Sequence, residues 1–312
     1  MDKKPCMTHY QAARKKRIRV SIIMIFIVVP AMMAIGYLLL KDRWYLPLSI
    51  LILIAIMSPF FMIFENRKPK AREVVLIAMM SALTVTAQMI FHVIMPFQVG
   101  TALVVISGIS LGPEAGFLIG ALARFVVNFY MGQGAWTPWQ MFCWGLLGFL
   151  AGICFNSDSI NELKARKFTV IIGPIMTIIA AEALGYIFFL LFPGKDDGFI
   201  GWRLYAFGAV GLLIGVLLQG KRLPIDSVTL ALFTFCTTFV IYGGIMNVAA
   251  MLLSMNTPGA PSLSLNTLRL LYISGAPYDF LHAITASICI FLFGGIIIKK
   301  LERIKIKYGI YR

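Results

Sequence analysis

Long apolar blocks separated by short polar segments dominate the chain. Within each block the apolar residues are continuous and do not alternate with polar ones, which favours helices over strands. A helix that crosses a bilayer needs roughly 20 apolar residues, because its backbone groups must be satisfied internally in hydrocarbon. We therefore predict about ten transmembrane helices, over residues 18–40, 44–64, 73–94, 99–112, 114–131, 137–155, 169–193, 199–219, 226–254 and 275–298.

Two of these blocks need comment. The block at 99–112 is too short to cross a bilayer easily at about 1.5 Å per residue, and it ends at Gly112 and Pro113, where proline favours a helix break. We expect a short helix that is buried inside the bundle. The first block follows a basic segment but lacks a convincing cleavage site, so we expect it to be retained as an anchor rather than removed as a signal peptide.

The composition agrees with an all-α integral membrane protein without a soluble domain. Of the 312 residues, 60% are hydrophobic and 13% are charged, whereas roughly half of a soluble domain is apolar. We therefore expect a multi-pass membrane protein in contact with the lipid bilayer.

The net charge of +15 reflects topology rather than nucleic-acid binding. If the N-terminus is cytoplasmic, 22 of the 28 lysines and arginines fall in cytoplasmic segments and five fall outside, while Arg124 lies within a span. This is the positive-inside distribution, and with an even number of spans it places both termini in the cytoplasm. We expect no nucleic-acid partner.

Motifs of catalysis are missing from the sequence. It has no phosphate-binding loop, no zinc-protease motif and no recognisable nucleophile motif. The three histidines are scattered, and the five cysteines lack metal-ligand spacing. These absences favour transport or ligand capture over enzymatic activity, and we expect neither a metal nor a cofactor.

Several ionisable residues lie within predicted spans, where such groups are costly and usually functional. Arg124 is either a structural partner of a carboxylate or of carbonyl groups, or a ligand contact. Glu182 is better explained by a packing hydrogen bond than by function. Asp279 and His282 are three residues apart, on one face of the last helix, and form either a local pair or part of a binding site.

The predicted outer loop at 131–140 combines glycine, amide and aromatic residues. Its glycines permit a sharp turn and close approach of the backbone to a ligand, and Thr137 with Pro138 indicates a helix start. The tryptophans are either anchors at the membrane interface or walls of a pocket for a small organic ligand. The candidate binding residues of this loop are Gln133, Trp136, Trp139 and Gln140.

Five stretches, in the same order, resemble the substrate-specific (S) component of energy-coupling factor (ECF) vitamin transporters. The resemblance covers about 71–155 and 226–312, and the tryptophan loop is its most specific part. The five stretches are Lys70–Ala78, Leu111–Ala121, Gly132–Phe142, Tyr242–Asn247 and Pro277–Ala283.

The resemblance implies a six-helix core in a prokaryotic cytoplasmic membrane, which binds a vitamin or its precursor from outside. A membrane coupling subunit and two cytoplasmic ATPases, as separate chains, would then drive release inward. By position in the family, the A-x-x-x-A motif that contacts the coupling subunit falls on Ala78 and Ala82, which also form a small-residue pattern that permits close helix packing. The substrate-binding positions fall on Gln98, Asn128, Gln133, Trp136, Trp139, Gln140, Asn247, Asp279 and His282, to which we add Arg124.

The chain is longer than a six-helix S component. We predict a basic tail with an extra hairpin over 1–70, four core helices over 71–159, an inserted hairpin over 160–224, and the last two core helices with a basic tail over 225–312. Whether the second hairpin shapes the pocket or only flanks it stays open.

Three functions are compatible with these patterns. The leading hypothesis is the substrate-capture subunit of an ECF importer, for a heterocyclic vitamin; family character suggests cobalamin or a related precursor. The second is a stand-alone secondary transporter that uses Arg124 and Glu182 as an ion or proton path. The third is a membrane enzyme or scaffold, which would retain no ligand on purification.

Overall fold

The computed structural model describes residues 71–94, 97–155, 169–191, 202–219, 226–254 and 264–308, together with Ile54, which is helical and exposed. The chain divides into two compact units, Met1–Pro69 and Lys70–Arg312. All elements discussed below belong to the second unit. The predicted helices at 18–40 and 44–64 lie, apart from Ile54, outside the described residues.

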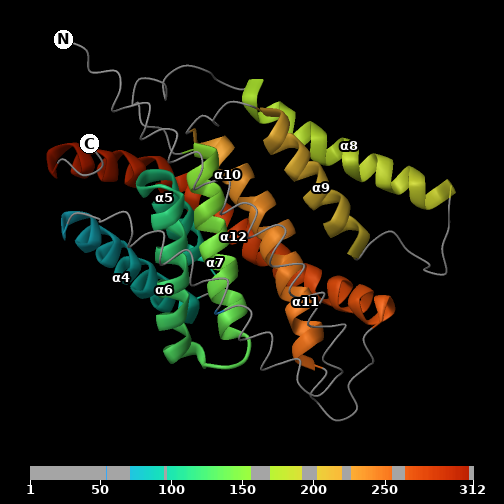
Figure 1. Cartoon of the computed structure of the whole chain (residues 1–312), viewed down its shortest axis with the longest axis horizontal. Coiled ribbons are helices and arrows are strands. Elements are labelled where there is room, and N and C mark those ends of the chain that lie inside the picture. The colour runs from blue at the N-terminus through green and yellow to red at the C-terminus, as the bar shows by residue number, and fades with distance from the viewer. Residues whose placement is uncertain are drawn as a thin grey trace. The chain divides into compact units, whose positions relative to one another are not determined.

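Helices are the only regular secondary structure in the described part of the chain, as the sequence predicted (Figure 1). The π-helix η3 continues α10 into α11 without a break, so these three elements form the single predicted span at 226–254. The elements are α4 (Ala71–Ile94), α5 (Val99–Leu111), α6 (Pro113–Met131), α7 (Thr137–Phe155), α8 (Thr169–Leu191), α9 (Trp202–Gln219), α10 (Ser227–Cys236), η3 (Thr237–Tyr242), α11 (Gly243–Ser254) and α12 (Leu265–Tyr308).

The short helix α5 is buried along its length, which confirms the prediction for 99–112. Every residue of α5 after Val99 is buried. Gly112 then adopts a φ of 99°, a backbone conformation that glycine tolerates and other residues avoid. Pro113 begins α6, where its missing N–H has no partner to lose.

The last helix is longer than predicted. The apolar pattern indicated 275–298, but α12 spans 44 residues, Leu265–Tyr308, with Pro277 inside it. Membrane helices tolerate an internal proline because neighbouring groups and local adjustments satisfy the freed carbonyl. At its C-terminal end the helix continues through lysine and arginine residues, which have good helix propensity although they end the apolar pattern.

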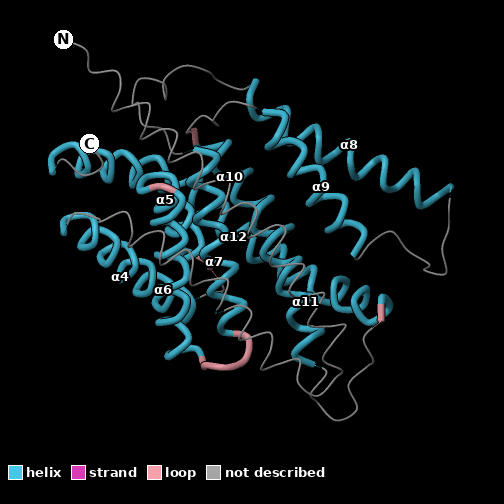
Figure 2. Tube along the Cα trace, in the orientation of Figure 1, coloured by secondary structure: helices cyan, strands magenta, loops and turns pink. Residues whose placement is uncertain are grey.

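Helices α5, α6 and α7 pack closely against one another, and glycines make this possible. A Cβ atom on Gly108 would collide with the carbonyl of Gly148, and a Cβ atom on Gly148 would collide with the carbonyl of Gly116. The backbones of the three helices therefore approach as closely as small residues allow in membrane bundles. A loop that is visible in Figure 2 joins α6 to α7.

The remaining helices complete the unit around this group. Helix α12 packs against α10, α11 and α5, and α4 packs against α5 and α6. Helices α8 and α9 run side by side as a pair (Figure 1), and α9 reaches η3 and α12.

Five helices in the described part are long and apolar enough to cross a membrane: α4, α6, α7, the continuous α10–η3–α11 segment, and α12. Shorter apolar helices lie in α5, α8 and α9. The total of ten spans and the cytoplasmic position of both termini remain predictions.

Candidate substrate-binding site

A hydrogen-bond network lies beneath the loop that joins α6 to α7. Asn128, which is 1% exposed, donates its amide Nδ2 to Gln140 Oε1 at 2.9 Å and to Thr137 Oγ1 at 3.0 Å. Arg124 donates its Nε to the same Gln140 oxygen at 3.0 Å. Three of the residues predicted to bind substrate, Arg124, Asn128 and Gln140, thus meet at one oxygen atom.

The loop itself is tied to this network through Thr137. Its hydroxyl donates to Gln133 Oε1 at 2.9 Å and accepts from the backbone N–H of Gly134 at 3.1 Å. The Gln133 amide also donates to the carbonyl of Phe125 at 3.1 Å. The side chain of Gln133 therefore holds the loop in place, and Thr137 is the element of the network that the sequence analysis treated only as a helix cap.

The two loop tryptophans have different surroundings. Trp136 is 44% exposed, and its indole N–H donates to the carbonyl of Gly132 at 3.4 Å. Trp139 is 1% exposed. Its indole N–H, like that of the buried Trp144, has no hydrogen-bond partner among the described residues, and the same holds for Asn128 Oδ1. Buried polar atoms without partners are costly, so these three mark the region as able to receive a polar ligand or water.

A second polar group surrounds Asp279 on α12. Asp279 Oδ2 accepts a hydrogen bond from the hydroxyl of Tyr205 and another from Asn247 Nδ2, each at 2.7 Å. The Asn247 amide also donates to the carbonyl of Gly243 at 2.8 Å. At Gly243 a Cβ atom would lie only 2.6 Å from Asp279 Cγ, so glycine at this position lets α11 approach the carboxylate.

Of the two alternatives for Asp279 and His282, a local pair is not what the structure shows. His282 Nε2 instead lies 2.8 Å from the hydroxyl of Thr101 on α5, and its ring meets the ring of Tyr242 edge-on at a centroid distance of 4.5 Å. Asp279 and His282 therefore act on different neighbours from the same helix.

Gln98 contributes at the start of α5. Its side-chain Oε1 accepts from Gln88 Nε2 at 3.1 Å, and its backbone N–H donates to the hydroxyl of Thr285 at 3.4 Å. Gln88, which is fully buried, also accepts from the N–H of Gly100 at 2.9 Å. These bonds join α4, α5 and α12.

Trp144 and Tyr242 connect the polar groups. The Arg124 guanidinium lies over the Trp144 ring, 5.2 Å from its centroid. The Cη2 atom at the far edge of the Trp144 ring lies 2.6 Å from the position that a Cβ atom on Gly100 would take. Gly100 directly precedes Thr101 in α5. Thr101 in turn bonds to His282, and the His282 ring meets Tyr242. Gly243, which follows Tyr242, lies against Asp279.

Thr101, Tyr205 and Tyr242 were not among the predicted site residues. Tyr242 begins the family-like stretch Tyr242–Asn247, but no motif marks Thr101 or Tyr205, because hydroxyl groups are common in membrane helices. Tyr205 brings α9, from the predicted second hairpin, into direct contact with Asp279.

Arg124 and Glu182 are not brought together. Glu182 lies on α8 with its carboxylate close to Gly208 of α9, whereas Arg124 bonds to Gln140 of α7. No hydrogen bond or ion pair between them is present in the described residues. The structure therefore lends no support to an ion path that runs through both.

Helix α4 presents one covered face and one open face. Its buried residues recur every fourth position at Leu76, Met80, Thr84 and Gln88. Ala78 and Ala82 are exposed on the other face. The two alanines predicted to contact the coupling subunit are thus exposed in the described part of the chain.

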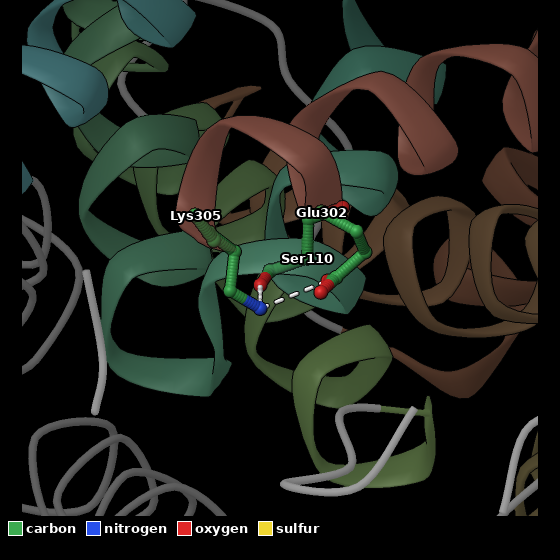
Figure 3. Close-up of polar contacts among 3 residues, drawn as sticks. All are labelled: Ser110, Glu302 and Lys305. Carbon is green, nitrogen blue, oxygen red and sulfur yellow. Dashed lines mark hydrogen bonds and ion pairs between the residues drawn. The ribbon is translucent and has the colours of Figure 1, made fainter. Parts of the chain in front are cut away.

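Lys305 of α12 caps the C-terminal end of α5. Lys305 Nζ donates to the carbonyl of Ser110 at 2.6 Å and to Glu302 Oε1 at 2.8 Å, and Figure 3 shows the ammonium group between these two oxygens. Carbonyls in the last turn of a helix lack intrahelical partners, and a cation is favourable there. The bond thus fixes the C-terminal part of α12 against the short buried helix.

Comparison with known proteins identifies the first part of the unit. Residues 68–194 match the family model of the ECF-type riboflavin transporter, S component. Residues 68–194 are an ECF S-component domain. An S component is the substrate-binding subunit of an ECF importer and is not an enzyme, which confirms the resemblance and the prediction of a multi-pass membrane protein of transport. No curated protein and no solved structure matches this chain.

The extent of the match adds two points. The S-component match includes α8, which the predicted inserted hairpin contains, and it ends before the 226–312 stretch in which the resemblance was also noted. The expectation of cobalamin or a related precursor finds no support, because the matching family is that of the riboflavin transporter.

Proposed function

We propose that this protein captures a flavin or a closely related heterocyclic vitamin from outside the cell and delivers it to the cytoplasm within an ECF importer. A membrane coupling subunit and two cytoplasmic ATPases complete the importer. The observation that carries the proposal is the polar network of Arg124, Asn128 and Gln140 beneath the α6–α7 loop, next to the buried indole N–H groups of Trp139 and Trp144.

The arrangement suits an aromatic ligand with a few polar groups. Small-molecule sites are mostly apolar, with a small number of placed donors and acceptors that fix orientation. Here the aromatic rings of Trp139, Trp144 and Tyr242 are buried. The hydrogen-bonding groups come from Asn247 and Asp279 on one side and from Arg124 on the other.

The proposal includes a division of the chain. The core of the S component would consist of 71–159 and 225–312, with hairpins added over 1–70 and 160–224. The tryptophan loop would face outward and both termini inward, so that Ala78 and Ala82 meet the coupling subunit in the membrane. The remaining predicted contacts, Gln98, Gln133, Trp136 and His282, would shape the site through the loop and α5.

Ligand binding by the isolated chain tests this function. The purified protein, without ATP or partner subunits, is titrated into riboflavin, and the quenching of flavin fluorescence is recorded. Mass spectrometry of the denatured protein identifies any ligand retained from the cell. Saturable binding of riboflavin or retention of a heterocyclic vitamin is expected. A chain that retains nothing and binds no vitamin of a standard panel contradicts the proposal.

A further inference from the structure

Arg124 carries a positive charge that no carboxylate neutralises in the described part of the chain. Its Nε bonds to the neutral amide of Gln140, and its guanidinium lies over the Trp144 ring. The terminal nitrogens donate to no described group. An arginine within a membrane span is costly in this state, and such residues normally face a partner or a functional cavity.

Asp279 is in the complementary situation. Its Oδ2 accepts from Tyr205 and Asn247, which are both neutral. Its Oδ1 accepts no hydrogen bond from the described residues, and no lysine, arginine or histidine among them pairs with it. A carboxylate has room for further donors on its second oxygen. Asp279 Oδ1 is therefore a hydrogen-bond acceptor whose orientation is fixed by the two bonds to Oδ2 and which is open to a further donor.

The fold keeps these two opposite charges apart. Arg124 lies on α6 and Asp279 on α12, and the side chains of Trp144, His282 and Tyr242 lie on the path between them. A charge held inside a protein without a partner of opposite charge is strongly unfavourable. The separation of the two charges instead leaves a positive and a negative pole on different helices, with the buried rings of Trp144 and Tyr242 near them.

We propose that the substrate bridges these poles, accepting hydrogen bonds from Arg124 at one end and donating a hydrogen bond to Asp279 Oδ1 at the other, with its aromatic ring against Trp144 and Tyr242. This inference rests on the proposed function and narrows the substrate class to dipolar heterocycles that carry both acceptors and a donor. A flavin has these groups: two ring carbonyls, one ring N–H and the hydroxyls of its ribityl chain.

Replacement of Asp279 by asparagine tests the donor end. In D279N the amide oxygen would take the place of Oδ2, because Tyr205 and Asn247 both donate there. The amide NH₂ would then stand in the place of Oδ1 and present a donor where the carboxylate presented an acceptor. A ligand donor would meet this NH₂ unfavourably. The riboflavin affinity of D279N is expected to fall by roughly tenfold or more, since hydrogen bonds to charged groups are strong.

Two riboflavin analogues show whether this loss comes from the ligand contact. One is 3-methylriboflavin, which lacks the ring N–H, and the other is lumiflavin, which lacks the ribityl hydroxyls. The wild-type chain should bind weakly the analogue that lacks the donor to Asp279. For that analogue, the D279N substitution should lower the affinity by less than about twofold further. A merely structural role of Asp279 would reduce binding of all three flavins by one common factor.

The acceptor end is tested in the same way at Arg124. R124M should weaken riboflavin binding by roughly tenfold or more, and R124K should retain part of the affinity. In 2-thioriboflavin and 4-thioriboflavin a weaker sulfur acceptor replaces one carbonyl oxygen. The loss of affinity caused by R124M should therefore be smaller for the analogue whose sulfur takes the place of the oxygen that Arg124 contacts. The control D226N removes a carboxylate at the cap of α10, where Asp226 accepts from Val228 and Thr229, and should bind all flavins like the wild type.

The possible outcomes separate this inference from the proposed function. Binding of riboflavin by the wild type, with equal losses for every flavin in D279N and in R124M, overturns the inference and leaves the function standing. Absence of any flavin or vitamin binding by the wild type overturns both. Ligand-dependent losses at Asp279 and at Arg124 support both.

Discussion

Tyr205 and Asp279 are 74 positions apart in the sequence, and the tyrosine hydroxyl donates to the carboxylate Oδ2 at 2.7 Å. The Tyr205 ring also packs against Tyr272 and Phe239, at centroid distances of 4.4 and 5.1 Å. The contact ties the α8–α9 pair to the last helix at the side chain we propose as the negative pole of the site. Under this proposal the second hairpin belongs to the binding region and is more than a lipid-facing addition.

Removal of this hydroxyl should weaken both the ligand site and the fold. In Tyr205→Phe the ring contacts remain, but Asp279 loses one of its two orienting donors, and hydrogen bonds to charged groups contribute about 1.5–3 kcal/mol. We expect weaker riboflavin binding, measured by fluorescence quenching, and a lower thermal unfolding midpoint in detergent. Tyr278→Phe is the matched control, since Tyr278 is 77% exposed beside Asp279. Equal behaviour of the two variants would refute the proposed role.

Enlargement of the exposed alanines on α4 should separate binding from transport. In Ala78→Trp or Ala82→Trp a bulky ring would stand on the open face of the helix and block close approach of another helix. Riboflavin binding by the isolated chain should persist, whereas uptake into cells that contain the complete importer should fall to background. Val93→Trp, which replaces a 70% exposed residue at the other end of α4, serves as the control. Wild-type uptake by Ala78→Trp would show that the assigned interface is wrong.

Loss of Lys305, which bonds to the C-terminal end of α5, should destabilise the bundle. Lys305→Met leaves the buried carbonyl of Ser110 without its charged donor, which costs about 1–3 kcal/mol, whereas Lys305→Arg keeps a donor. The thermal unfolding midpoint should therefore fall for Lys305→Met and recover in part for Lys305→Arg. Lys307→Met should match the wild type, because Lys307 is exposed. The interpretation fails if the two methionine variants unfold alike.

A single methyl group between α6 and α7 should be poorly tolerated. In Gly148→Ala the new Cβ would meet the backbone carbonyl of Gly116, and overpacking of this kind costs about 1–3 kcal/mol. We expect a lower yield of folded protein in size-exclusion chromatography and a lower unfolding midpoint. Gly295→Ala provides the comparison, since no atom lies within 4 Å of the Cβ position there. A Gly148→Ala variant as stable as Gly295→Ala would contradict the close helix contact.

The sequence by itself determined the helices of the described part and most of their limits. Continuous apolar blocks can only be helices in a bilayer. Gly112 and Pro113 stop α5, because glycine tolerates a non-helical backbone and the residue before a proline disfavours the α-helical conformation. The α6–α7 loop was equally readable from its glycines and Thr137. The limits of α12 were misjudged, since the pattern records apolarity and not helix propensity beyond the bilayer.

Only the tertiary structure decided which polar residues meet. Arg124, Asn128 and Gln140 converge because α6 and α7 lie side by side, and the sequence had placed them in one region through the loop. The spacing of Asp279 and His282 suggested a pair, yet Tyr205 and Asn247 bond to the first and Thr101 lies beside the second. Such pairings depend on how helices rotate and cross, and the apolar pattern is nearly the same around a membrane helix, so it carries little record of which face meets which neighbour.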